Sequence, residues 1–399
     1  MTLSIIIISY NAKYFTEQCL CSVRKAIDYM SEQTSSSNAE VILIDNHSTD
    51  NSISYLSPLF PWVKFIGNET NAGYAVANNK GWKLAAGEYI LFLNPDTLMA
   101  EDCLWKCIAF MENQPDAGSL GVHMIDGSGN FLPESKRGFP SPLAAFYKLI
   151  GLNSLFPTSK HFAAYYSGHL PETDNNSVDV LSGAFMLVRK KLLVKTGGFD
   201  EQFFMYAEDI DLSYQIKKEG YNNYYFAGTT IIHFKGESTN KDIRYVKLFY
   251  KAMILFVKKH YAGGASFLLR ILLQMSIWFS GLIATVAKLF SGSSLRHSTP
   301  QQLLIICTSE EEHELKEILK HYPLPSILRI DPGKNPSDFY RDYAFDGIIF
   351  VGGKLSWAAI ITLVKSLSNK TIFRFHANGS NSIVSSYSKK SNGEVFTKQ

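Results

Sequence analysis

The feature that most constrains this chain is a series of short apolar runs, each of which ends abruptly in a polar or acidic loop. Three of these runs occupy residues 3–8, 41–44 and 89–93. Runs of this length that are rich in β-branched residues and bounded by turn residues are typical of buried parallel strands. With helices expected between them, at about 15–30 and 74–86, the pattern predicts an alternating β-α-β fold.

The loops after these strands give the first indication of a site. They are Ser9-Tyr10-Asn11, Asp45-Asn46 and Asn94-Pro95-Asp96. Open α/β sheets bind ligands in a crevice at the carboxyl ends of their strands. Because Asp45 and Asp96 each follow a strand, we expect both carboxylates to lie in one crevice.

The chain is long enough for two domains. We predict a first α/β domain over residues 1–260, an apolar segment over 261–298, a small α/β domain over 299–377 and a disordered tail over 378–399. In the small domain, strands are expected at 303–307, 327–330, 347–351 and 371–375. The tail is rich in Ser and Lys, a composition typical of disorder.

Residues 271–287 form an uncharged stretch between Arg270 and Lys288. As a helix this stretch would be about 25 Å long, which is short of the roughly 30 Å hydrocarbon core of a bilayer. Basic residues lie on both sides, so a re-entrant or in-plane helix at a membrane surface fits better than a span. A buried helix in a soluble domain is the alternative.

The overall composition excludes several classes of protein. A formal net charge of +3 is too small to indicate a nucleic-acid partner. The five cysteines contain no Cys-x-x-Cys pair, so they predict neither a zinc site nor a disulfide framework, and a reduced cytosolic setting is expected. The first residues lack the basic region of a signal peptide.

Asp96 is the sharpest candidate for metal binding. A divalent cation that bridges two phosphates needs only one or two protein carboxylates, and a carboxylate just past a strand is well placed for that task. The alternative is a simple turn, because Asn, Pro and Asp are common turn residues. His233 ends another predicted strand and could complete the shell of the cation, although a solitary histidine is more often structural.

Asp45 could accept a hydrogen bond from the imide N–H of a uracil or thymine ring, or could merely cap the next helix. The segment Asn71-Ala72-Gly73-Tyr74, followed by Asn79, presents the same choice between a helix cap and a helix start that lies along a nucleotide.

Three acids, Glu208, Asp209 and Asp211, fall within four positions at a predicted helix N-terminus. Acids in the first turn of a helix are often there to complement the helix dipole. Here the acids repel one another, and neighbouring aromatic residues would partly desolvate them. Both effects raise a carboxylate pKa towards that of a useful general base.

Taken together, these motifs resemble glycosyltransferase family 2 of the GT-A fold, and especially its rhamnosyltransferase-like branch. The resemblance covers residues 3–240 and rests on an ordered set of motifs. In chain order these are Ile8 to Asn11, Ile44 to Asn46 with Ser48 to Asp50, Asn71 to Tyr74 with Asn79 to Gly81, Asn94 to Asp96, Ser182-Gly183-Ala184, Gly197 to Asp200 with Glu208-Asp209, and His233.

The resemblance implies a role for each motif. Asp45 and the loop of Ser9, Tyr10 and Asn11 would hold the base and ribose, Asp96 would ligate Mg²⁺ or Mn²⁺ on the diphosphate, and His233 would contact the metal or diphosphate. Asp209 would be the general base, supported by Glu208 and Asp211. Ser182, Gly183 and Ala184 would line the sugar and acceptor. Asn94 replaces the usual second acid of the family's metal motif, so the metal assignment depends on Asp96.

The resemblance further implies an inverting, metal-dependent transfer from a nucleotide-diphosphate sugar, with dTDP-L-rhamnose preferred to a UDP-hexose, in cell-surface polysaccharide synthesis. The aromatic, basic stretch at 245–261 and the apolar segment after it favour a lipid-linked glycan acceptor and the cytoplasmic face of the inner membrane. Two alternatives are a non-catalytic nucleotide-sugar-binding protein and a metal-dependent phosphohydrolase. Val351-Gly352-Gly353, beyond the resemblance, is either a nucleotide-binding loop or a tight packing turn.

Overall fold

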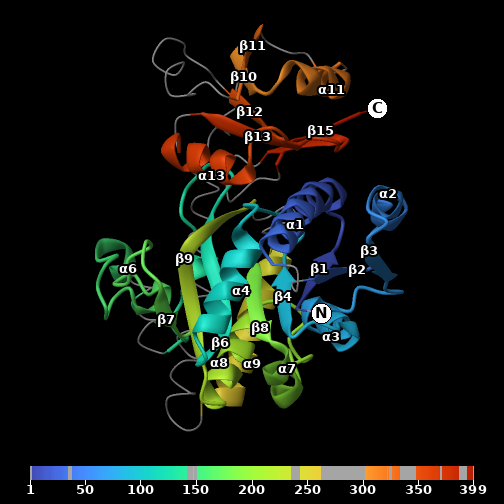
Figure 1. The fold of residues 1–399 in the computed structure, drawn as a ribbon. Helices are drawn as coiled ribbons and strands as arrows, with labels where there is room; N and C mark the ends of the chain where they lie inside the picture. The colour runs from blue at the N-terminus through green and yellow to red at the C-terminus, as the bar shows by residue number, and fades with distance from the viewer. Residues whose placement is uncertain are drawn as a thin grey trace.

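The computed structural model shows an α/β protein with two sheets (Figure 1). The residues described are 2–34, 38–141, 147, 151–234, 243–261, 302–320, 322, 326–332, 347–368, 371–385 and 393–398. The apolar stretch at 271–287 lies outside these ranges. Within them, no helix has the length and hydropathy needed to cross a membrane.

Residues 3–260, which we call the first half, alternate strands and helices around the larger sheet. Its strands are β1 (Leu3–Ser9), β2 (Ala39–Asp45), β3 (Val63–Gly67), β4 (Tyr89–Leu93), β5 (Thr97–Met99), β6 (Ala117–Ile125), β7 (Asn176–Val178), β8 (Phe185–Arg189) and β9 (Asn222–His233). Its principal helices are α1 (Lys13–Gln33), α2 (Ser52–Leu59), α3 (Tyr74–Leu84), α4 (Cys103–Asn113), α6 (Leu152–Leu155), α7 (Lys190–Thr196), α8 (Glu208–Lys218) and α9 (Ile243–His260).

The larger sheet has the strand order β3-β2-β1-β4-β8-β6-β9-β5, with β7 beside β9. It is a mixed sheet, as predicted. Among the described strands, however, parallel pairs are as frequent as antiparallel ones, so the sheet is not mostly parallel. Every residue of β1 and β4 is buried. A strand covered on both faces needs apolar residues at consecutive positions, which explains the apolar runs of the sequence.

Several elements differ from the sequence prediction. The apolar and β-branched runs at 223–226 and 229–233 predict two strands, but the structure has one strand, β9, whose pairing with β6 is irregular near the middle. The run at 178–181 predicts another strand, but the structure has β7, which ends at Val178. The sequence analysis also missed α4 and β6, which add a helix and a fully buried strand to the fold.

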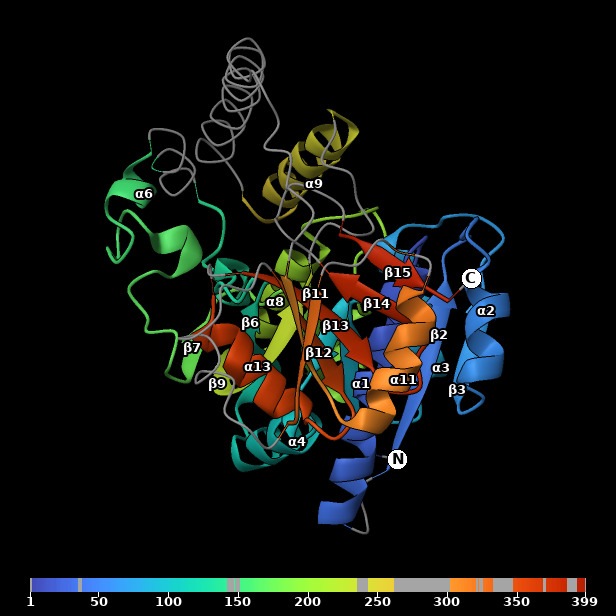
Figure 2. The same cartoon turned by 90° about the horizontal axis from the view of Figure 1, so that it is seen from above.

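Residues 302–397 contain the strands of a smaller sheet, which we call the second unit. Its strands have the order β11-β10-β12-β13-β14-β15. They are β10 (Gln302–Ile306), β11 (Ser326–Ile330), β12 (Gly347–Gly352), β13 (Ile372–Ala377), β14 (Ser382–Ser385) and β15 (Val395–Thr397). The helices α11 (Ser309–Leu319) and α13 (Trp357–Ser366) pack on alternate residues of these strands and thus cover opposite faces, as Figure 2 shows from above.

The expectation of a disordered tail from 378 onwards is wrong for two parts of that segment. β14 pairs antiparallel with β13, and β15 pairs with β14. All four residues of β14 are buried. Their small and apolar side chains, Ser-Ile-Val-Ser, are accommodated because α1 of the first half covers this edge of the sheet.

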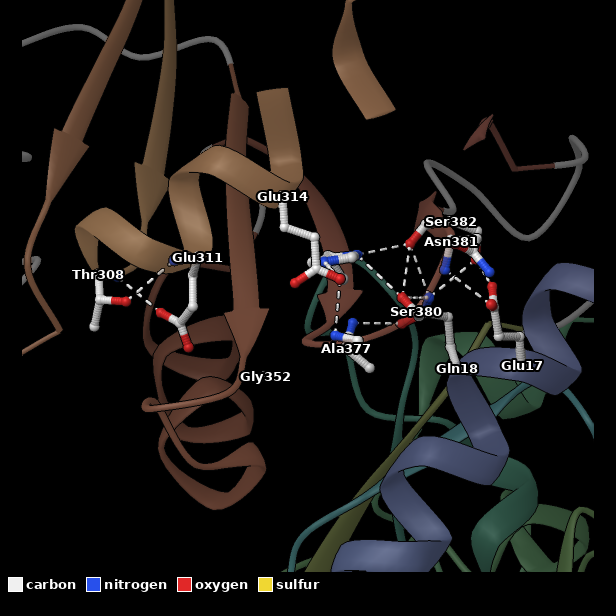
Figure 3. Close-up of polar contacts among 12 residues, drawn as sticks. Glu17, Gln18, Thr308, Glu311, Glu314, Gly352, Ala377, Ser380, Asn381 and Ser382 are labelled. Atoms are coloured by element: carbon white, nitrogen blue, oxygen red, sulfur yellow. Dashed lines mark hydrogen bonds and ion pairs between the residues drawn. The ribbon is translucent and has the colours of Figure 1, made fainter. Parts of the chain in front are cut away.

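The turn at Gly352 and Gly353 is a packing turn. Lys25 of α1 donates through Nζ to the carbonyl oxygen of Gly352 at 2.7 Å. A Cβ at Gly353 would lie 2.0 Å from a carboxylate oxygen of Glu311, which is held in the capping box of α11. The carboxylate therefore occupies the space above this turn, and its charge would repel a phosphate (Figure 3).

Candidate active site

Three strands of the larger sheet bring the candidate residues together at one edge. Asn94 follows β4, Ala184 precedes β8 and His233 ends β9. The backbone N–H of Asn94 donates to the carbonyl oxygen of Ala184 at 3.0 Å, and Asn94 Nδ2 lies 3.4 Å from His233 Nε2. Thr97, the first residue of β5, is paired with His233. Segments that are far apart in the sequence thus form one cluster.

Asp96 and His233 form a buried pair in this cluster. A carboxylate oxygen of Asp96 lies 3.4 Å from His233 Nε2, and Asp96 is 3% exposed. The other ring nitrogen of His233 is buried and has no hydrogen-bond partner among the described residues. One carboxylate oxygen and one imidazole nitrogen suit a divalent cation such as Mn²⁺.

No group of three or more His, Cys, Asp or Glu side chains suited to a metal ion occurs in the part of the chain that the structure describes. A cation at Asp96 and His233 would therefore need further oxygen ligands from phosphates and water, which is the usual arrangement for ions that bind nucleotides. The residues present fit a cation that arrives with a diphosphate.

Asp209 lies at the start of α8, after Tyr206 and Ala207, which both adopt left-handed backbone conformations. One carboxylate oxygen of Asp209 accepts from Arg137 Nη2 at 2.6 Å and from the N–H of Gly183 at 3.1 Å. A Cβ at position 183 would lie 3.4 Å from the Tyr74 hydroxyl oxygen and 3.6 Å from Asp209 Cβ, so this loop packs closely on both residues. The Tyr74 hydroxyl donates to the Gly183 carbonyl oxygen at 2.8 Å and connects α3 to the same loop.

Glu208 has a different environment from its neighbour Asp209. Burial, followed by the negative charge of Asp209, raises the pKa of Glu208 to about 8. One oxygen of its carboxyl group is buried without a hydrogen-bond partner among the described residues. The raised pKa favours the protonated form of Glu208 at neutral pH.

Two observations link the acids of α8 to the cation pair. Burial raises the pKa of the Tyr74 hydroxyl, and the nearby carboxylates of Glu208, Asp209 and Asp96 raise it further. In addition, Gly183 and Ala184 connect Asp209 directly to Asn94. Asp209 and Asp96 are therefore connected through Gly183, Ala184 and Asn94.

Arg137 is a site residue that the sequence analysis missed. Its side chain is 12% exposed and also donates to the carbonyl oxygen of Leu181 at 2.8 Å. Although burial works against its charge, the carboxylate of Asp209 raises the pKa of Arg137. The only sequence signal was a basic pair, Lys136-Arg137, in a segment otherwise rich in Pro, Gly and aromatic residues.

Asp45 lies at the end of β2 and is 6% exposed. One of its oxygens accepts from the N–H of Ser48 at 2.9 Å, as a capping residue would. The other oxygen is buried and has no partner among the described residues. Because a buried acceptor without a partner costs about 1–3 kcal/mol, this oxygen is well suited to the N–H of a ligand.

The loops beside Asp45 hold one another in place. The N–H of Asn11 donates to Ser48 Oγ at 2.9 Å, and Asn11 Oδ1 accepts from the N–H of Thr49 at 2.7 Å. Tyr10, next to Asn11, has an exposed side chain. The loop that carries Tyr10 is thereby fastened to the loop that follows Asp45.

Asn46, Asn71 and Gly73 shape the turn that leads into α3. Asn46 Nδ2 donates to Asn71 Oδ1 at 2.8 Å, and the same oxygen accepts from the N–H of Gly73. Gly73 has a φ of +85°, and a Cβ there would lie 2.6 Å from the carbonyl oxygen of Phe204. Glycine thus allows the segment before α8 to approach α3.

Four residues that the sequence places in the site make structural contacts instead. Ser9 is fully buried and its hydroxyl contacts Thr16. Asn79 bonds to the backbone of Phe199 through both its side-chain nitrogen and its side-chain oxygen. Asp211 is fully buried and binds Lys259 and His260 of α9. Ser182 accepts from the N–H of Ala184 and so shapes its own loop.

The family model described as Glycosyl transferase family 2 matches residues 4–197. This segment, just under half of the chain, is similar to glycosyltransferase family 2. The match includes Asp45 and Asp96 and ends before α8, so Asp209 and His233 lie beyond it. Relatives of the chain include proteins named as rhamnosyltransferases.

Among these relatives, the N-acetylglucosaminyl-diphospho-decaprenol L-rhamnosyltransferase of Mycobacterium tuberculosis is 29% identical over 278 residues, which are 67% of this chain and 88% of that protein. Rhamnosyltransferase WbbL of Escherichia coli is 33% identical over 42% of this chain and 60% of its own length. A solved mannosyltransferase from Pyrobaculum calidifontis gives a TM-score of 0.46 at 18% identity, covering 73% of this chain and 76% of its own.

Proposed function

We propose that this chain is an inverting, metal-dependent glycosyltransferase of family 2 that transfers a sugar from a nucleotide diphosphate to a lipid-linked or oligosaccharide acceptor in cell-surface polysaccharide synthesis. The preferred donor is dTDP-L-rhamnose, and a UDP-hexose is the alternative. The names of the mycobacterial and Escherichia coli relatives support rhamnose. The name of the mycobacterial relative supports a polyprenyl-diphosphate acceptor.

One observation carries the proposal: the cation pair Asp96–His233 and the acid pair Glu208–Asp209 are joined through Asn94, Ala184 and Gly183. The first pair provides ligands for a cation on the diphosphate. The second provides one ionised carboxylate beside a neutral one. An acceptor hydroxyl between them would meet a base on one side and the anomeric carbon of the donor on the other.

In this mechanism, Asp45 binds the base of the donor through its free oxygen, and Tyr10 lies beside it. Asp209 removes the proton of the acceptor hydroxyl as that oxygen attacks the anomeric carbon, and the carbon–oxygen bond to the diphosphate breaks. A single displacement inverts the anomeric centre. Mg²⁺ or Mn²⁺ held by Asp96 and His233 would neutralise the charge that develops on the diphosphate.

Arg137 and Glu208 prepare Asp209 for this role. The hydrogen bonds from Arg137 and Gly183 fix one carboxylate oxygen of Asp209, and the other oxygen accepts from the N–H of Ile210 at 2.8 Å. The carboxylate is thus held in one orientation for the acceptor. The neutral carboxyl of Glu208 avoids a second negative charge beside the base. Environments that separate the pKa values of two adjacent carboxyl groups commonly assign them different roles.

We further propose that the enzyme works at the cytoplasmic face of the inner membrane. Helix α9 carries the exposed residues Lys251 and Lys258 and precedes the apolar segment at 261–298 in the sequence. Basic residues beside an apolar segment favour an anionic membrane surface. A lipid-linked acceptor would be available at the same surface.

Asp209→Asn tests the proposal directly. The substitution keeps the shape of the side chain but removes its basicity, so transfer should fall by about 10²-fold or more, while nucleotide binding is retained. Product formation from dTDP-L-rhamnose and a polyprenyl-diphosphate glycan, measured by mass spectrometry with Mn²⁺ present, provides the readout. Asp174→Asn, an exposed site, serves as the control and should retain activity. Transfer near the wild-type rate in Asp209→Asn would show that the assigned mechanism is wrong.

Two simpler assays separate the alternatives. A phosphohydrolase releases free sugar or phosphate whether or not an acceptor is present, whereas the transferase needs the acceptor. A non-catalytic binding protein would be stabilised by its nucleotide sugar without any turnover. A thermal-shift screen of dTDP-L-rhamnose against UDP-hexoses identifies the donor, because the correct one stabilises the fold by mass action.

A further inference from the structure

The second unit packs on the elements that carry the candidate cation ligands. One buried cluster contains Leu98 of β5 and Ile232 of β9 together with Phe350 and Phe375 of the second unit. Asp96 immediately precedes β5, and His233 is the last residue of β9. The core of the second unit is therefore continuous with the packing behind the cation pair.

Three phenylalanines, which we call the aromatic bridge, cross this interface. Phe234 lies between Phe15 of α1 and Phe375 of β13, with ring centroids 5.2 and 5.3 Å away. Phe234 follows His233 directly, and its backbone N–H donates to the carbonyl oxygen of Asp96 at 3.0 Å. A movement of Phe234 would therefore displace both cation ligands.

Polar contacts fix the second unit in one position against α1. Gln18 Nε2 donates to Ser380 Oγ and to the carbonyl oxygen of Ser382, both at 2.8 Å, and Gln18 Oε1 accepts from the N–H of Ala377 (Figure 3). Glu17 accepts from the N–H of Asn381 at 2.9 Å. All these groups are buried, so sliding would leave polar atoms without partners, at a cost of about 1–3 kcal/mol each.

A third contact joins the unit to β5. The carboxylate of Glu101, two residues after β5, accepts from the N–H groups of Trp357 and Ala358 at the start of α13, at 2.7 and 3.1 Å. Helix α13 thus holds the far end of the short strand whose near end follows Asp96. Both strands that carry cation ligands are restrained by the second unit.

We infer that Phe375 is a positioning residue for the cation site: through Phe234 it holds His233 against Asp96, and the second unit thereby sets the affinity of the first half for a divalent cation. The inference rests on the proposed function for the identity of the ligand. Metal sites require ligand positions held within a few tenths of an ångström. Two ligands on separate strands meet that requirement only if the packing behind them is rigid.

The test compares Phe375→Ala with Phe373→Ala in the full-length protein. Phe373 lies two residues earlier in β13, is equally buried, and packs on Phe350 within the second unit. Mn²⁺ binding is measured by electron paramagnetic resonance in the presence of dTDP, and melting temperature is measured in parallel. Both variants should melt at lower temperature by similar amounts. Only Phe375→Ala should raise the Mn²⁺ dissociation constant, by about tenfold, equivalent to about 1.4 kcal/mol.

Phe375→Leu provides a variant that should still fold if Phe375→Ala does not, because leucine fills most of the space of the ring. This variant should bind Mn²⁺ with an affinity between those of wild type and Phe375→Ala. Equal Mn²⁺ affinities in Phe375→Ala and Phe373→Ala would overturn the inference. If wild type binds Mn²⁺ through Asp96, as shown by loss of binding in Asp96→Asn, yet transfers no sugar, the proposed function fails while the positioning role stands.

Discussion

Glu208 and Asp209 are neighbours with the same functional group, and their surroundings give them different charges. Asp209 receives two hydrogen bonds on one oxygen, one of them from a guanidinium. Glu208 has a buried oxygen without a partner among the described residues, and its pKa is raised to about 8. Two adjacent carboxyl groups therefore differ because only Asp209 receives hydrogen bonds from Arg137 and Gly183.

The raised pKa of Glu208 predicts a specific dependence of stability on pH. Between its ordinary value of 4.5 and about 8, the folded protein holds a proton that the unfolded chain releases. The free energy of unfolding should therefore fall as pH rises through this window, by at most about 1.4 kcal/mol per pH unit from this group. Glu208→Gln stays neutral, so its stability should decline less between pH 5 and 8.

Urea unfolding of both proteins at pH 5, 6.5 and 8 measures this difference. Other titrating groups are common to the two proteins and cancel in the comparison. Parallel declines for wild type and Glu208→Gln would mean that Glu208 titrates normally in the folded state.

Asp45 supplies a second prediction at the residue scale. Its free oxygen is placed to accept an N–H of the donor base, and a hydrogen bond to a charged acceptor contributes about 1.5–3 kcal/mol. Asp45→Asn removes the negative charge. Its side-chain NH₂ can also face the N–H of the base, and two donors do not form a hydrogen bond. The dissociation constant for dTDP or UDP, measured by calorimetry, should rise by about ten- to a hundredfold. Glu69→Gln, an exposed charge after β3, should leave this constant unchanged.

At the scale of elements, α8 holds two different sites. Its first turn presents Asp209 to the cluster, while Asp211 is fully buried and binds Lys259 at 3.0 Å and His260 at 2.5 Å. These contacts fasten α9 to the first half. Asp209 thus belongs to the candidate site, whereas Asp211 holds α9 in place.

Asp211→Ala should destabilise the protein by about 1–3 kcal/mol, because it leaves the buried ring nitrogen of His260 without its partner and Lys259 with Asp200 alone. Hydrogen exchange followed by mass spectrometry should show faster exchange in α9, while α3 and β4 are little affected. Affinity for dTDP should stay close to the wild-type value. A large loss of nucleotide affinity without faster exchange in α9 would instead support a direct role for Asp211 in the site.

At the scale of the whole molecule, the two sheets share one apolar cluster that extends from Phe15 to Phe375. Buried polar contacts from Gln18 and Lys25 cross the same interface. If one of two parts that share a core unfolds alone, the apolar surface of the other part is exposed to water, which favours unfolding in one cooperative transition.

We therefore expect both sheets to unfold in a single transition. Hydrogen exchange measured against urea concentration should give the same midpoint for peptides from β1 and β4 as for peptides from β12 and β13. Two well-separated midpoints would show that the second unit unfolds independently, and that its packing stabilises the first half only weakly.

The sequence was sufficient to predict most strands and the polar loops at their ends. The runs before Asp45 and Asp96 predicted β2 and β4 closely, because strands buried on both faces need consecutive apolar side chains. The second sheet followed from the same alternation. The strands after Asn378 did not, because Ser-Ile-Val-Ser is too short and too polar to identify a strand whose burial depends on α1.

What the sequence determined by itself was local: the order of strands and helices, the polar loops at strand ends, and the acids at the start of α8. Only the tertiary structure decided which partners those acids have. It brought Arg137 to Asp209, Asp211 to His260 of α9, and Phe375 to Phe234, the residue after His233. The physical reason is that such contacts depend on how strands pair and helices pack across long sequence separations, whereas periodicity and turn residues report only on neighbours.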